Sequence, residues 1–160
     1  MTAHRGYDRV QLHGCLALSY LCWTNTDNAA QITAHDGYHA VVRAMATHSH
    51  HAEVQEHACR ALANISHVPL ADCAIALEHI VLAMRRHELV AEVQEAACRA
   101  MVTISLISPT NKDRLFVFGA ANVVIAAMLH FPKSRLVQQE ACNALAHLAY
   151  EHTQLNRAIT

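Results

Sequence analysis

The sequence predicts an all-α protein, built as a right-handed α-solenoid of about three repeated units with a partial unit at each end. Of its 160 residues, 53% are hydrophobic, while only 4 are Gly and 3 are Pro. This composition is too apolar for a disordered chain and favours a packed fold. Aromatic residues make up only 5%, which favours Ala- and Leu-rich helices over a β-sandwich. A sequence module also returns about every 40 residues, and such a period is typical of a repeat architecture.

The repeated module contains one cysteine at a fixed position. Residues 52–66 return almost unchanged as residues 91–105, again as residues 136–149, and more faintly as residues 10–21. The anchor cysteines of the four copies are separated by 44, 39 and 44 residues; they are Cys15, Cys59, Cys98 and Cys142. A methionine stands 14 residues before three of them, at Met45, Met84 and Met128. The shorter step therefore lies between Cys59 and Met84.

The module has the spacing of a helix with one buried face. In residues 52–66 the apolar positions are Val54, Ala58, Leu62 and Ile65, and the other copies repeat this pattern. A shorter apolar segment ending at the unit methionine predicts a preceding helix. In two units a glycine, Gly37 or Gly119, opens that helix after another short periodic stretch, so these units are expected to have three helices.

The second unit lacks such a glycine, and Pro69 suits the first turn of a helix. We therefore expect residues 70–86 to form one uninterrupted helix, as in HEAT repeats. The chain then divides into residues 8–24 (third helix only), 25–66, 67–107 (shortened), 108–150 and 151–160 (first helix only), all in one array over residues 1–160.

At these residues the chain resembles armadillo repeats, and more distantly the armadillo region of leucine-rich-repeat kinases. The resemblance covers nearly the whole chain and implies a non-catalytic scaffold that binds proteins. In armadillo folds a polar stripe on the third helices lines a concave groove. The residues of this stripe lie four positions apart on each third helix. They are Tyr20, Glu56, Arg60, Asn64, Glu95, Arg99, Thr103, Asn143 and His147, together with Leu12, Leu16 and Gln139.

The stripe has an alternative interpretation, a solvated face with Glu-to-Arg pairs one helical turn apart. If it is a groove, the resemblance also limits the partner. Only Asn64 keeps the Asn of nuclear-import adaptors, so basic localisation peptides are not expected. The chain has only two lysines, Lys112 and Lys133, so a long acidic ligand is not favoured. A peptide or helix of neutral or mixed charge fits best, with Arg60 and Arg99 as anchors.

Cysteine and histidine offer two further chemical hypotheses. The four anchor cysteines occupy equivalent helix positions, which indicates buried packing residues rather than one nucleophile. His48 and His87 follow the unit methionine by three residues, and His130 follows it by two. These histidines are expected in loops along one edge, where His48, His50 and His51 form a weak candidate for a metal site or a pH-responsive edge.

Several function classes are not expected. The net charge of -1 lacks the basic footprint of a nucleic-acid-binding protein. No apolar run is long enough to cross a membrane, and the first residues do not resemble a signal peptide. Phosphate-loop and hydrolase motifs are absent from the sequence, so we expect no enzyme and no cofactor. Six cysteines without a secretion signal favour reduced thiols and a cytoplasmic location.

The sequence therefore predicts a scaffold that binds a protein or peptide partner in the groove. Two alternatives stay open. In the first alternative, the array is a structural spacer or an oligomerisation segment. It would then self-associate through its open ends, because an array cut between units exposes apolar surface. Otherwise the histidine edge makes it a metal- or pH-responsive module.

Overall fold

The fold consists of helices in the part of the chain that the structure describes. A computed structural model describes residues 1–66 and 73–158, with side-chain surroundings for residues 1, 3–66 and 73–149. These residues contain no strand. In chain order the helices are the 3-10 turn η1 (Thr2–His4), α1 (Asp8–Cys22), α2 (Thr26–Ala34), α3 (Gly37–Thr47), α4 (Ala52–Ile65), α5 (Ala74–Arg86), α6 (Ala91–Ser105), α7 (Pro109–Val117), α8 (Ala120–His130) and α9 (Arg135–Ala158).

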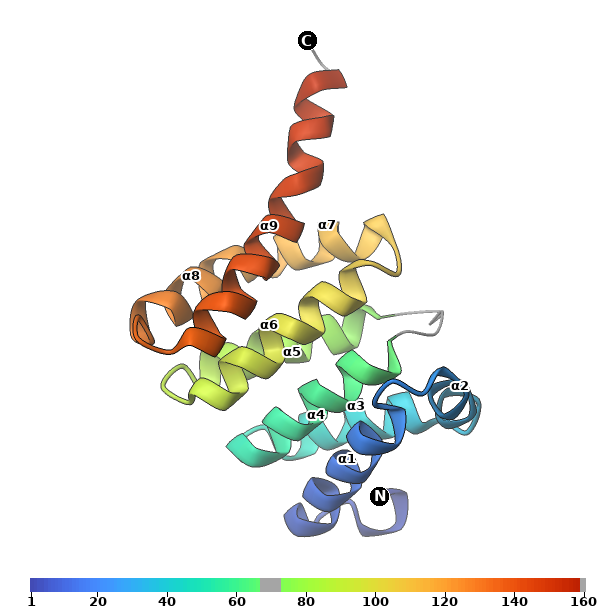
Figure 1. Cartoon of the computed structure of the whole chain (residues 1–160). Coiled ribbons are helices and arrows are strands. Elements are labelled where there is room, and N and C mark those ends of the chain that lie inside the picture. Colours follow the sequence, from blue (N-terminus) through green and yellow to red (C-terminus); the bar gives the residue numbers. More distant parts are fainter. Residues whose placement is uncertain (67–72, 159–160) are drawn as a thin grey trace.

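The helices form two layers of an α-solenoid. Helices α1, α4, α6 and α9 follow one another side by side, and the other helices lie behind them (Figure 1). The most extensive contacts join α1 to α4, α4 to α6 and α6 to α9. These are the cysteine-bearing helices of successive units, so the predicted α-solenoid is confirmed.

The hydrophobic core is continuous from unit to unit because equivalent positions are buried in each. The anchor cysteines Cys15, Cys59 and Cys98 are completely buried. In the second layer Val41, Ile80 and Val124 are also fully buried. Each unit buries apolar side chains against its neighbours, as in other solenoids.

A left-handed residue starts the second helix in the two units that have a glycine there. Gly119 has φ +75° and directly precedes α8. In the first unit Asp36 takes the left-handed conformation, with φ 62°, and Gly37 is the first residue of α3. Gly37 is needed for a different reason: a Cβ atom there would lie 2.7 Å from the carbonyl oxygen of Ile32. A glycine therefore allows α2 and α3 to meet in a sharp corner.

The second unit does not contain the long helix expected for residues 70–86. Helix α5 begins at Ala74, and Cys73 is its N-cap residue with φ -107° and ψ 0°. The expectation of one uninterrupted helix is therefore wrong, because the backbone at Cys73 leaves the helical conformation. Residues 67–72, including Pro69 and Leu70, lie outside the described part of the chain.

Helix α9 is longer than the third helices of the other units. It runs without a break from Arg135 to Ala158, so the separate first helix expected to begin at residue 151 is not formed. The local sequence explains the difference. Residues 149–153 contain neither Gly nor Pro, whereas Pro109 follows α6 closely and starts α7 with Ser108 as its cap.

Among the described residues, no single helix is long and apolar enough to cross a membrane. Helices α7 and α8 reach the required length and hydropathy only when taken together, and they meet at a bend of 68°.

Candidate protein-binding face

The predicted groove residues lie on the face formed by α1, α4, α6 and α9, which we call the third-helix face. The structure does not place them alike. Asn64 is buried, with 4% of its surface exposed, whereas Glu56, Arg60, Glu95, Arg99 and Thr103 are half-buried. Tyr20 at the end of α1 is 72% exposed. On α9, Asn143 is exposed and His147 is half-buried.

An ion-pair network joins α4 to α6. The Nε atom of Arg60 lies 3.1 Å from a carboxylate oxygen of Glu56, one turn earlier in α4. Its guanidinium also lies 3.7 Å from a carboxylate oxygen of Glu95 in α6. The side chain of Arg60 is 35% exposed. Two carboxylates therefore hold the arginine by ion pairs, while part of its side chain stays accessible from solvent.

A second network spans three helices. The side-chain amide of Asn64 donates a hydrogen bond to the carbonyl oxygen of Ser19 in α1, at 2.9 Å. Its oxygen accepts a weaker bond from Arg99 of α6, at 3.4 Å. The guanidinium of Arg99 also lies over the ring of Trp23, 4.7 Å from its centroid. Asn64 therefore fixes the spacing of α1 and α4 instead of offering a free side chain.

Trp23 belongs to this site although it is outside the predicted stripe. Trp23 follows α1 directly and is 53% exposed. Its ring stacks on Arg99 of α6, the second helix after α1 in the row of third helices. The repeat pattern gives no signal for it, because the residue lies just beyond the repeated module. Thr103 supports the same region: its hydroxyl donates to the carbonyl oxygen of Arg99 at 3.0 Å.

A ladder of glutamines, which was not predicted from the sequence, supports the face from behind. In each copy a glutamine four residues before the anchor cysteine donates to two carbonyl oxygens, ten and seven residues earlier. Gln55 bonds the carbonyls of Met45 and His48 at 3.1 and 3.0 Å. The other members of the ladder are Gln11, Gln94 and Gln138.

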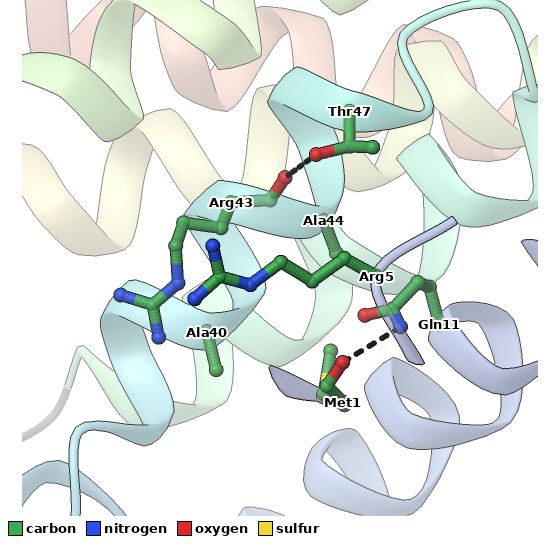
Figure 2. Close-up of a pocket in the computed structure, with 7 residues that line it drawn as sticks. All are labelled: Met1, Arg5, Gln11, Ala40, Arg43, Ala44 and Thr47. Atoms are coloured by element: carbon green, nitrogen blue, oxygen red, sulfur yellow. Dashed lines mark hydrogen bonds between the residues drawn. The ribbon is translucent and has the colours of Figure 1, made fainter. Parts of the chain in front are cut away.

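The first member of this ladder shows that Met1 takes the place of a unit methionine. Figure 2 shows the Gln11 side chain against the carbonyl of Met1, at 3.1 Å. The crevice around it has a cavity of about 10 Å³, which corresponds to no more than one water molecule. The crevice is therefore part of the unit packing and not a ligand site. The repeated glutamine, a polar residue on a buried helix face, is the signal in the sequence from which this role could have been predicted.

The histidine edge is a second set of links between units. The rings of His48 and His87 hydrogen-bond the carbonyl oxygens of Arg5 and Ser49, at 2.6 and 2.9 Å. His130 makes a longer contact to the carbonyl of Glu88, at 3.3 Å. Each histidine thus joins the end of a second helix to the loop of the preceding unit.

The three metal candidates turn toward different partners. His48 is buried against Arg5, His50 meets the guanidinium of Arg86 at 2.8 Å, and His51 faces Asp8 at 3.8 Å. Among the described residues, no group of three or more His, Cys, Asp or Glu side chains is placed to hold a metal ion.

The cysteines form a buried column that is unsuited to nucleophilic chemistry. Burial raises the pKa of Cys15 and of Cys98 to about 12 and raises the pKa of Cys59 as well. A thiol with a raised pKa is a poor source of thiolate. None of the six cysteines is in a disulfide, and Cys142 is the exposed member.

Stacked helical units with a preformed side-chain network on one face define an interaction repeat protein of the armadillo type. The family model described as LRRK2 ARM repeat matches residues 1–115. The chain therefore belongs to the LRRK2 ARM repeat family. Neither the comparison with curated proteins nor that with solved structures gave a match. Armadillo repeat domains are generally non-catalytic scaffolds that bind protein partners.

Proposed function

We propose that the chain binds a peptide or a helix of a partner protein along the third-helix face, in the cytoplasm, without catalysing a reaction. The observation that carries the proposal is the contact of Arg99 in α6 with Asn64 in α4 and with Trp23, which directly follows α1. A cytoplasmic location agrees with six cysteines that form no disulfide.

The composition of the site supports this use. Tyr20, Trp23 and Arg99 belong to the residue types that contribute most binding energy in protein interfaces. Tyr20 and Trp23 are more than half exposed. Arg60 and Arg99 are already held by neighbouring side chains, so less side-chain entropy is lost when a partner binds.

The charges of the site indicate the chemistry of the partner. Arg60 lies between two carboxylates, those of Glu56 and Glu95, and Arg99 lies against an aromatic ring and an amide. The face therefore alternates acidic, basic and aromatic groups. A segment with an aromatic or aliphatic anchor and both signs of charge complements it better than a strongly basic or acidic one.

Selection from a random peptide library against the immobilised chain tests the proposal. Selected peptides are then titrated against the parent and against the double variant Arg60→Ala/Arg99→Ala. We expect the double variant to lose at least about tenfold in affinity, since one hot-spot residue contributes more than about 1 kcal/mol.

The control is the double variant Arg86→Ala/Lys133→Ala, which removes the same charge from exposed positions outside the third helices. It should bind as the parent does. Selected peptides that bind the Arg60→Ala/Arg99→Ala variant with parental affinity would contradict the proposal.

A further inference from the structure

Helix α5 exposes a row of large apolar side chains on its solvent side. Ile75 is 60% exposed and Leu82 is 43% exposed. These two residues lie seven positions apart, about two helical turns, and therefore share one side of α5. Leu89, in the turn after α5, is 72% exposed. We call these three residues the α5 stripe.

The exposure of the α5 stripe does not depend on what lies beyond either end of the array. Helix α3 of the unit before and helix α8 of the unit after both pack on α5, so α5 already has a neighbour on each side in the second layer. Its core side is closed as well, because Leu77, Ile80 and Met84 are at most 1% exposed. The stripe therefore lies on a side of α5 that the neighbouring units leave open.

The α5 stripe is particular to the second unit. Counted from the unit methionine, its three positions hold polar residues in the first unit and small or charged residues in the third. They are Asp36, Arg43 and His50 in the first unit and Gly119, Ala126 and Lys133 in the third. A single exposed leucine needs no explanation, whereas a grouped apolar surface with a polar rim is typical of an interaction site.

A cavity of about 160 Å³ lies beside Leu82, between α5 and the end of α3. Its floor includes Met45 and Gln55, which are buried, and its rim includes His79, Leu82 and Arg86 of α5. The amide of Gln55 already donates to the carbonyl oxygens of Met45 and His48, so the floor does not require a polar ligand. Because a cavity of about 150 Å³ can hold a benzene molecule, this one has room for an aliphatic or aromatic side chain.

The rim of this cavity is basic. The guanidinium of Arg86 lies 2.8 Å from Nε2 of His50, so its neighbour there is an imidazole ring and not a carboxylate. Among the described residues, those that line the cavity include no Asp or Glu. An acidic side chain of a partner would therefore complement the rim beside Arg86.

The other charges near α5 limit this preference to the cavity. Glu78, one turn before Leu82, and Glu88, in the turn after α5, are both exposed. Arg43 of α3 is already paired with Asp36, at 2.8 Å. The surface as a whole is therefore of mixed charge, and an acidic group is expected at one point of the partner and not along its whole length.

From these observations we propose that the α5 stripe and the adjoining cavity bind an amphipathic helix of a partner protein. One apolar side chain of that helix fills the cavity, further apolar side chains cover Ile75 and Leu82, and an acidic side chain lies beside Arg86. A helix suits the site because apolar residues seven positions apart on the partner repeat over the same distance as Ile75 and Leu82. This surface belongs to the second layer, behind the third-helix face (Figure 1), and does not depend on the function proposed for that face.

Selection from a display library of helix-forming peptides tests the proposal. The full chain is the bait, and the variant Leu82→Glu is used to remove peptides that bind elsewhere. Enriched peptides should carry apolar residues three, four or seven positions apart and an acidic residue beside them. Absence of enriched peptides, or enrichment of peptides without this spacing, would overturn the proposal.

Titration of the enriched peptides by fluorescence anisotropy measures the contribution of each element. Leu82→Glu should weaken binding at least about tenfold. The new glutamate lies one turn from Arg86 and can pair with it, so α5 should stay folded. Alanine replacement along the peptide should identify one apolar residue, the occupant of the cavity, that also costs at least about tenfold. A peptide without such an anchor would contradict the role of the cavity.

A charge exchange tests the contact at Arg86. Arg86→Glu should weaken binding of a peptide with its acidic residue intact, and replacement of that residue by Lys should restore binding to Arg86→Glu but not to the parent. Equal affinities in all four combinations would contradict the acidic partner.

Two control variants separate this surface from others. Leu136→Glu changes another exposed leucine, 56% exposed, to the residue found at the equivalent positions Glu53 and Glu92; it should bind as the parent does. Arg60→Ala/Arg99→Ala should also bind as the parent does, and a loss there would assign the peptides to the third-helix face instead. Sedimentation of the chain without peptide completes the test, since association that Leu82→Glu abolishes would identify a second copy as the occupant and overturn the proposal.

Discussion

The glutamine ladder gives the sharpest test of how the units are held together. Gln94 is 1% exposed and donates to the carbonyl oxygens of Met84 and His87, at 3.1 and 2.8 Å. The carbonyl of His87 also accepts a bond from the backbone of Val90. Replacement of Gln94 by Met keeps nearly the same volume but removes both donated bonds. The main cost therefore falls on the buried carbonyl of Met84.

The expected loss follows from ordinary hydrogen-bond energies. A buried carbonyl left without a partner costs about 1 to 3 kcal/mol, and the second bond contributes about 0.5 to 1.5 kcal/mol. We therefore expect Gln94→Met to lower the free energy of unfolding by about 2 to 4 kcal/mol. Urea unfolding followed by circular dichroism, with linear extrapolation to water, measures this change.

Gln139→Met is the control, because Gln139 is exposed on α9. Its effect should stay within about 0.5 kcal/mol. If Gln94→Met also lost less than about 0.5 kcal/mol, the two bonds would add nothing measurable to the stability of the stack, contrary to this prediction.

Two further predictions concern the corner at α3 and the buried thiols. Gly37→Ala should lower the free energy of unfolding by about 1 to 3 kcal/mol, because its Cβ would press on Ile32. The control Gly6→Ala should change this free energy little, since no atom lies within 4 Å of the added Cβ. Equal stabilities of the two variants in urea would count against the tight corner between α2 and α3. Burial raises the pKa of Cys15 and Cys98 to about 12 from the ordinary value of 9.0. The stability that the two protonated thiols contribute to the folded state is therefore complete below pH 9 and is lost as the pH rises toward 12. The free energy of unfolding should fall by about 1.4 kcal/mol per thiol and pH unit in this range. Urea unfolding at rising alkaline pH should show this decline, and Cys98→Ala should make it shallower; an unchanged slope in the variant would contradict the burial of this thiol.

The sequence predicted the helices of the repeated module because their apolar positions face a neighbour in every unit. Val54, Val93 and Val137 are all almost fully buried, and such repetition is visible without coordinates. The break before Ala74 and the continuation of α9 were not predicted. The presence or absence of a single Pro does not by itself fix where a helix ends, because the conformation of the surrounding backbone also decides it.

The candidate site was predictable only in part. Spacing by four residues placed Arg60, Glu95 and Arg99 on one face, and the structure joins them to neighbouring helices. Exposure of each residue depends on contacts between units, which periodicity does not give. The burial of Asn64 against Ser19 and the stacking of Trp23 on Arg99 are contacts of this kind.

Near-copies of one helical module stack in chain order and share a continuous interior. An experimentally determined structure of the full chain tests it most directly. We expect Cys15, Cys59, Cys98 and Cys142 on four adjacent helices in that order, with the Asn64 side chain on the Ser19 carbonyl. The same four helices packed around one closed centre, with Asn64 far from Ser19, would contradict it.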